Sequence, residues 1–170
     1  LTTPADLGHD AAGYDLPPVE VHWHEVASDH AQAGVDRDGQ VRMFRDASIG
    51  VSDAASEKRG SLPARIAAMQ ALRAIDPGAH RVIWHDLEDE RRAIETAAPG
   101  VVSVYGSQDL DDRERAIIAF SDGEVAELAA KPSVAGTGCN FQRHCAWAIF
   151  LGVGFKFHDF IQAFHRIVRF

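Results

Sequence analysis

Cysteine is scarce in this chain of 170 residues, and no apolar run approaches the roughly 20 residues that a membrane span requires. The two cysteines, Cys139 and Cys145, lie close together late in the chain, which is not the spacing of a secreted disulfide framework. The first residues have neither the basic region nor the apolar core of a signal peptide. The sequence therefore predicts a soluble, intracellular protein.

Basic residues are outnumbered by acidic ones, because the chain has 17 lysine and arginine residues and 25 aspartate and glutamate residues, for a formal net charge of −8. A protein that coats nucleic acid by bulk electrostatics has the opposite balance, so any nucleic-acid contact must be local. A P-loop, the Gly-rich phosphate-binding segment that ends in Lys-Ser or Lys-Thr, is missing as well. With 46% hydrophobic residues, the chain is nevertheless long enough for one globular domain with its own core.

The first eighty residues show few regular patterns. Residues 1–18 are rich in Gly, Pro and Asp, and only residues 19–26 alternate like a β-strand. Residues 31–61 are small and polar with little apolar period, which predicts a surface loop or insertion. A helix is predicted from Ser61, with Pro63 in its first turn, and its apolar positions at helical spacing are Ile66, Met69, Leu72 and Ile75.

Short apolar runs alternate with segments of helical period from residue 81 onward. Strands are predicted at residues 81–85, 101–105, 125–130 and 147–151, and helices at residues 87–97, 110–120 and 157–170. This order predicts an α/β fold in which helices cover a parallel sheet. Such sheets bind ligands beyond the carboxyl ends of their strands, so we expect one functional edge formed by loops at Asp86, Gly106, residues 133–140 and residues 152–155.

The last predicted helix has two chemically different sides. At about 100° per residue, Gln162, Arg166 and Arg169 fall on one stripe. The opposite side is apolar and consists of Phe160, Ile161, Phe164, Ile167 and Val168. Guanidinium groups match the geometry of phosphate oxygens, so two arginines a turn apart could grip a transferring phosphoryl group. The alternative is an ordinary amphipathic helix with solvated arginines.

A second segment of chemical interest, residues 131–140, follows a predicted strand at the expected functional edge. Gly136 and Gly138 permit close approach of the backbone, so amides there could bind a nucleotide or a phosphate. The alternative is a tight turn between a strand and a helix, because a single Gly-x-Gly is common in such turns.

Together, the two segments resemble motifs V and VI of the Snf-type helicases of superfamily two. Gly136, Gly138 and Asn140 match the Gly-x-Gly-x-Asn of motif V. The Gln-Ala-x-x-Arg-x-x-Arg of motif VI is matched by Gln162, Ala163, Arg166 and Arg169. The resemblance covers residues 81–170 and is greatest with helicases of bacteria and their phages, although Lys131 and Pro132 stand where typical remodelers have Ser-Thr.

The resemblance implies a RecA-like, three-layer α/β domain that acts as the second motor lobe of an ATP-dependent DNA helicase or translocase. Residues 61–170 would form this lobe, and residues 1–60 a less regular arm that leads from the first lobe. The chain starts without methionine and stops directly after motif VI, so the first lobe, with its Walker A lysine and magnesium-binding acids, is expected elsewhere in a longer protein. The setting would be the cytoplasm of a bacterial or phage-infected cell.

The resemblance also implies roles for individual residues. Arg166 and Arg169 would be the catalytic arginine fingers that reach ATP, whose Mg²⁺ the first lobe would hold. Nucleotide contacts are expected from Gly136, Gly138 and Gln162. Contacts with the DNA backbone are expected from Lys131, Ser133, Asn140 and Ser107. This chain alone would then be inactive as an ATPase. The alternative function is a RecA-like nucleotide-binding or interaction domain without motor activity.

Several other residues favour structural roles. Two groups contain metal-binding residue types, namely His22, His24 and Glu25, and Cys139, His144 and Cys145. Exposed histidines explain the first group, and adjacent placement suits tetrahedral zinc poorly in the second, so no metal site is predicted. Residues 88–92 are predicted to be a solvated, charged helix face. Core positions are predicted at Trp84, Phe150 and Phe157.

Overall fold

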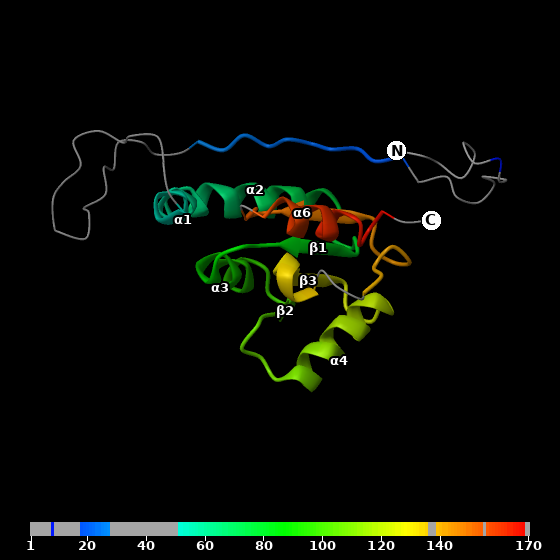
Figure 1. Cartoon of the computed structure of the whole chain (residues 1–170). Coiled ribbons are helices and arrows are strands. Elements are labelled where there is room, and N and C mark those ends of the chain that lie inside the picture. The colour runs from blue at the N-terminus through cyan, green and yellow to red at the C-terminus, as the bar shows by residue number, and fades with distance from the viewer. Residues whose placement is uncertain (1–7, 9–17, 28–50, 136–138, 155, 169–170) are drawn as a thin grey trace, which may run out of the picture.

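A computed structural model describes residues 8, 18–27, 51–135, 139–154 and 156–168 of the chain. Its centre is a sheet of four parallel strands in the order β2–β3–β1–β4. The strands are β1 Arg81–Trp84, β2 Val102–Val104, β3 Glu127–Ala130 and β4 Trp147–Phe150. The predicted parallel sheet is confirmed, and each strand lies within the range expected for it (Figure 1).

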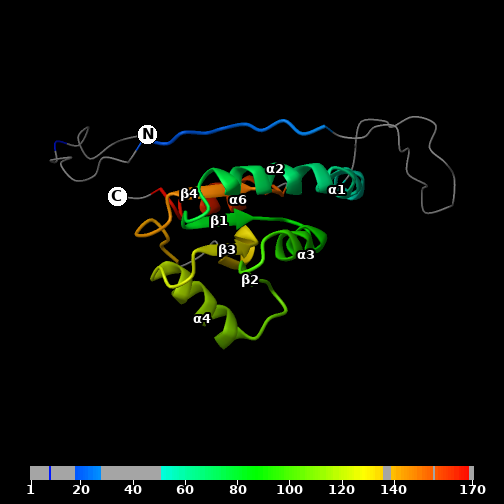
Figure 2. The ribbon, with the colours of Figure 1, turned by 180° about the vertical axis from the view of Figure 1, so that it is seen from behind.

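Helices cover both faces of the sheet and give three layers, as the two opposite views in Figures 1 and 2 show. One face carries α2 Leu62–Ile75 and α3 Glu88–Ala97. The other face carries α4 Leu110–Ser121, the short α5 Pro132–Ala135 and α6 Phe157–Phe164. A further helix, α1 Val51–Gly60, comes before α2 and contacts it.

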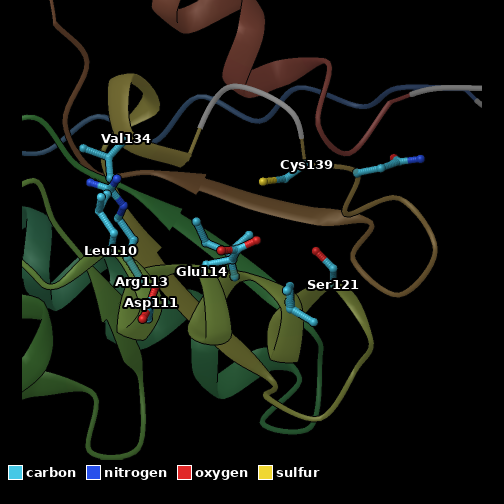
Figure 3. A pocket seen from close by; sticks show the side chains of 10 residues that line it. Leu110, Asp111, Arg113, Glu114, Ser121, Val134 and Cys139 are labelled. Atoms are coloured by element: carbon cyan, nitrogen blue, oxygen red, sulfur yellow. The ribbon is translucent and has the colours of Figure 1, made fainter.

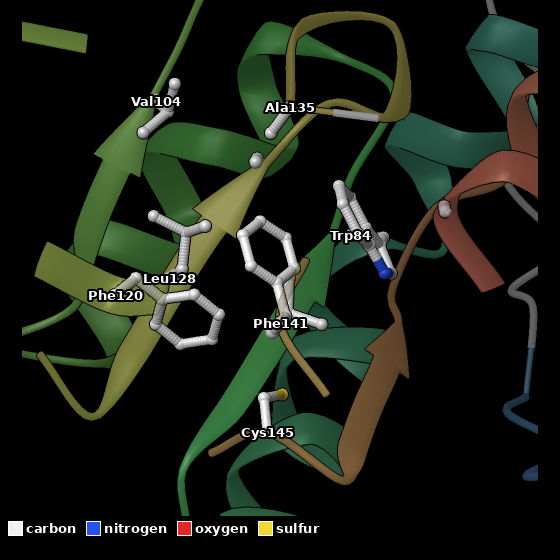
Figure 4. Packing of buried hydrophobic residues seen from close by; sticks show 10 residues of the cluster. Trp84, Val104, Phe120, Leu128, Ala135, Phe141 and Cys145 are labelled. Atoms are coloured by element: carbon white, nitrogen blue, oxygen red, sulfur yellow. The ribbon is translucent and has the colours of Figure 1, made fainter. Parts of the chain in front are cut away.

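Alternation along the central strands builds the two halves of the core. Trp84 of β1 points to the α4 side, where it belongs to one buried cluster with Phe120 and Phe141 (Figure 4). The ring centroids of Phe120 and Phe141 lie 5.0 Å apart, edge to face. Ile83, the preceding residue, packs on the opposite side with Met69 of α2. Both β1 and β3 are buried along their whole length, as expected for strands covered on two faces.

The N-terminal region differs from the sequence prediction in two places. Residues 51–60 form α1 instead of a surface loop, and ion pairs hold this helix against the segment that begins α3. The pairs are Lys58 with Asp86 at 2.6 Å and Arg59 with Asp89 at 2.8 Å. Residues 19–26 are not a strand, because no hydrogen-bonded neighbour pairs with them in the described part of the chain.

The last helix is shorter than predicted. α6 ends at Phe164, and a turn over residues 165–167 follows where the sequence pattern predicted a continuous helix. The prediction for Phe157 was wrong, because this side chain is 74% exposed in the first turn of α6, where the chain has left the sheet. One turn later, Phe160 packs on Phe150, with ring centroids 4.9 Å apart.

A buried charge cluster lies where β1 and β3 begin. Arg81 is fully buried, and its guanidinium lies 4.8 Å from the ring centroid of Trp147. Glu127 accepts two hydrogen bonds from Arg73, at 2.8 Å and 2.5 Å, and its Oε1 lies 3.1 Å from Nε of Arg81. The bonds with Glu127 raise the pKa of Arg73. One carboxylate therefore pairs with two arginines, one from α2 and one from β1.

We predict that Glu127→Gln destabilises the chain by about 3–5 kcal/mol, because Arg81 would remain buried without its counter-charge. Equilibrium urea unfolding followed by tryptophan fluorescence would measure the change. Glu124→Gln is the matched control, since Glu124 is exposed only three residues away and should change the free energy of unfolding by less than about 0.5 kcal/mol. Equal stabilities for the two variants would contradict this role of Glu127.

A buried histidine follows β1. His85 has no exposed surface, and burial lowers its pKa to about 4, although the nearby carboxylate of Glu90 acts in the opposite direction. In the unfolded chain its pKa would be about 6.5. The unfolded state therefore binds a proton more readily, so this contribution to stability is complete above about pH 6.5 and is lost as the pH falls toward 4.

We predict that the free energy of unfolding falls by about 3 kcal/mol between pH 7 and pH 4 through His85 alone. The pKa of His80 is also lowered by burial, which adds to the loss in the same direction. Urea unfolding at half-unit steps of pH, on the original chain and on His85→Leu, would test this. The variant should lose most of the dependence, and an unchanged pH profile would contradict the assignment.

Candidate functional site

Three of the four strands end at one edge that hydrogen bonds hold together. The carbonyl of Trp84, at the end of β1, accepts from Leu151 N at 2.9 Å and from Gly152 N at 3.2 Å. His85 N donates to the carbonyl of Ala130, at the end of β3, at 3.1 Å. The loops after β1, β3 and β4 therefore lie beside one another. The sequence predicted this for Asp86 and for residues 152–155. Residue 155 lies outside the described part of the chain.

Glu90 is the buried anion of this edge. Its Oε2 accepts hydrogen bonds from Asp86 N at 2.7 Å and Leu87 N at 2.9 Å, which caps the first turn of α3. Its Oε1 accepts from Nη1 of Arg65 at 2.6 Å. The prediction that residues 88–92 form a solvated face was therefore wrong at Glu90. The sequence did carry a signal for this role, because Glu90 lies three residues after the N-cap residue Leu87, where a glutamate can cap the helix.

Three candidates for contact with a nucleic-acid backbone lie at the ends of adjacent strands. Lys131 directly follows β3 and is half-buried, and Ser133 is exposed on α5. Ser107 is exposed in the turn after β2, which pairs with β3. The structure thus places Lys131, Ser133 and Ser107 on the expected edge, where side chains can reach a ligand. Their roles remain predictions.

Asn140 lies elsewhere. Phe141, the next residue, donates from its backbone N to the carbonyl of Arg166 at 3.0 Å. This segment leads into β4 rather than away from β3, so the predicted edge does not extend to residue 140. Figure 3 shows Val134 and Cys139 apart from each other along the pocket.

Arg166 joins the two segments that the sequence singled out. Its Nη1 donates to the carbonyl of Cys139 at 2.7 Å, which places the guanidinium against the motif V-like segment. However, Arg166 lies in the turn after α6, so the predicted helical stripe with Gln162 is wrong. Gln162 is on α6, and its Nε2 lies 2.9 Å from Nε2 of His158. Gly136, Gly138 and Arg169 lie outside the described residues.

A groove of about 770 Å³ lies between α4 on one side and Val134, Cys139 and Asn140 on the other (Figure 3). Its apolar lining comes from Leu110, Ile117, Ile118, Val134 and Cys139. Its polar lining has both signs of charge, with Asp111 and Glu114 beside Arg113. An anion would meet two carboxylates there, so this groove is poorly suited to a phosphate group.

The cysteines are poor candidates for nucleophiles. Burial raises the pKa of Cys145 to about 11 and also raises the pKa of Cys139. A high pKa leaves little of the reactive thiolate at neutral pH. Within the described residues, no group of three His, Cys, Asp or Glu side chains could hold a metal ion.

No helix in the described part of the chain has the length and apolar character needed to cross a membrane.

Solved structures share this fold. The chain is similar to the C-terminal part of the Fun30 ATPase domain, with a TM-score of 0.51 and 20% identity, over 61% of this chain and 36% of that one. It is also similar to S. cerevisiae Dbp5 bound to RNA and ADP BeF3, with a TM-score of 0.51 and 14% identity, over 62% of this chain and 28% of that one. No protein-family model and no curated protein sequence matches. The chain therefore has a RecA-like α/β fold, which it shares with these structures, and spans about a third of these solved chains.

Proposed function

We propose that this chain is the second motor lobe of an ATP-dependent, Snf-type DNA helicase or translocase. The observation that carries the proposal is the contact between the two motif-like segments, in which Nη1 of Arg166 lies 2.7 Å from the carbonyl oxygen of Cys139. The backbone bond between Phe141 and Arg166 adds a second link. A RecA-like fold with these two segments in contact is what such a lobe requires.

In the proposed mechanism, ATP binds between this lobe and a first lobe that carries the P-loop. Arg166 and Arg169 reach the phosphates when the two lobes close, and their positive charge stabilises the phosphoryl group in the transition state. The described residues hold no group of three metal-binding side chains, so the first lobe would supply the ligands of Mg²⁺. Gln162, Gly136 and Gly138 would contact the nucleotide.

The bond from Arg166 to Cys139 suggests how nucleotide state and nucleic-acid grip are coupled. Cys139 belongs to the segment that starts at Lys131, the first candidate for a backbone contact. A guanidinium that turns toward phosphate would release or shift the carbonyl of Cys139 and thereby the position of Asn140. Lys131, Ser133 and Ser107 would hold phosphates without reading base sequence. Such local contacts suit a chain with a net charge of −8.

We predict that Arg166→Ala or Arg169→Ala lowers ATP turnover by about a thousandfold or more in the longer protein that contains both lobes. Steady-state ATP hydrolysis with and without DNA or RNA would measure it and identify the preferred nucleic acid. Arg92→Ala is the control, because Arg92 is exposed on α3, on the opposite face of the sheet. Near-normal turnover in both finger variants would refute the proposal.

We also expect this chain alone to show no ATP hydrolysis, since it has no recognisable P-loop. Robust hydrolysis by the chain alone would mean that it holds a complete site of another kind. A two-lobe protein that binds ATP but never hydrolyses it, with any nucleic acid, would instead support an interaction domain without motor activity.

A further inference from the structure

Four charged side chains meet where β1 and β4 end. Lys58 of α1 lies 2.6 Å from Asp86, in the loop after β1. Arg65 of α2 lies 2.6 Å from Glu90 of α3, and both of these side chains are largely buried. The two ion pairs connect α1 and α2 with the start of α3.

Both cations also bind the backbone that leads from β4 to α6. Nη1 of Arg65 donates to the carbonyl of Leu151 at 2.5 Å, and Nζ of Lys58 donates to the carbonyl of Val153 at 2.5 Å. Arg65 further donates to the carbonyl of Lys58, which ties α1 to the same group. Two cationic side chains, one from α1 and one from α2, thus bind the linker of residues 151–154.

Two glycines let the carboxylates approach this linker. A Cβ on Gly152 would lie 2.2 Å from Oε2 of Glu90, a distance that no side chain could accept. A Cβ on Gly154 would lie 3.1 Å from Oδ1 of Asp86. The carboxylates therefore occupy the space beside the linker, and the cations bridge each carboxylate to a linker carbonyl.

The start of α6 has little packing of its own. Lys156, Phe157 and His158 are all exposed, whereas Ala163, near the end of the helix, is fully buried. The far end is also fixed by the bond between Phe141 and Arg166. The near end of α6 consequently takes its position from the linker that Lys58 and Arg65 hold.

We propose that Lys58 and Arg65 are positioning residues that set the orientation of α6, and with it the placement of Gln162 and Arg166. This inference rests on the proposed function for its catalytic consequence. Neither residue touches substrate in this assignment. They act by fixing residues 151–154, so that α6 holds the backbone of Arg166 in place while its guanidinium turns toward the phosphates.

Lys58→Met is the decisive variant, because Lys58 is partly exposed and its loss should leave the fold intact. Arg65→Met would strand the buried Glu90 and could prevent folding. Lys58→Arg restores a cation and should rescue. Arg59→Met is the matched control, since Arg59 also links α1 to α3 through Asp89 but has no bond to the linker.

Hydrogen exchange on this chain tests the positioning directly. In Lys58→Met we expect amide exchange in residues 152–154 and 157–161 to accelerate about tenfold or more, with β1 and α3 unchanged. Lys58→Arg and Arg59→Met should both match the original chain. Unchanged exchange in the linker, or equal acceleration throughout the chain, would overturn the inference.

ATP turnover by the two-lobe protein tests the catalytic consequence. Lys58→Met should lower kcat about tenfold or more with little change in KM for ATP, because the placement of Arg166 matters most in the transition state. Lys58→Arg should recover kcat, and an unaltered kcat in Lys58→Met would overturn this part. If the original two-lobe protein hydrolyses no ATP, the proposed function fails, while the exchange result still decides whether Lys58 positions α6.

Discussion

The carboxylate of Glu90 lies in the interior at the point where β1 and β4 end, and the site is arranged around it. It caps α3 through two backbone amides, pairs with Arg65 of α2, and fills the space that a side chain at Gly152 would need. A buried carboxylate without a cation would be costly, so Arg65 has to be in place for this edge to form. The packing of α2 against α3 thereby depends on one ion pair.

A second carboxylate, Glu127, has the same task at the other end of the strands. It pairs with Arg73 and Arg81, and Arg81 in turn lies against Trp147. The short parallel strands are thus fixed at each end by a buried anion with a cation from α2. Each strand contains only three or four residues and so makes few backbone hydrogen bonds to its neighbours. The buried ion pairs therefore help to fix how the helices lie against the sheet.

The candidate site is divided between two places. Lys131, Ser133 and Ser107 lie where strands end, whereas Arg166 lies beside Cys139 and Phe141 in the segment that comes before β4. α6 spans the distance between them, because it begins after the linker of residues 151–154 and ends near Phe141. α6 is thus held by charges near one end and by packing near the other.

The sequence by itself determined the order of the four strands, the parallel sheet and the two motif-like segments, because apolar period and motif spacing are local properties of the chain. Tertiary structure alone decided that Glu90 is buried, since its cation lies 25 residues earlier on another helix. It also decided that α6 stops at Phe164, where the backbone of Arg166 pairs with Phe141 instead of continuing the helix. The role of α1 was hidden for the same reason: its sequence has little apolar period, and ion pairs with Asp86 and Asp89 dock it.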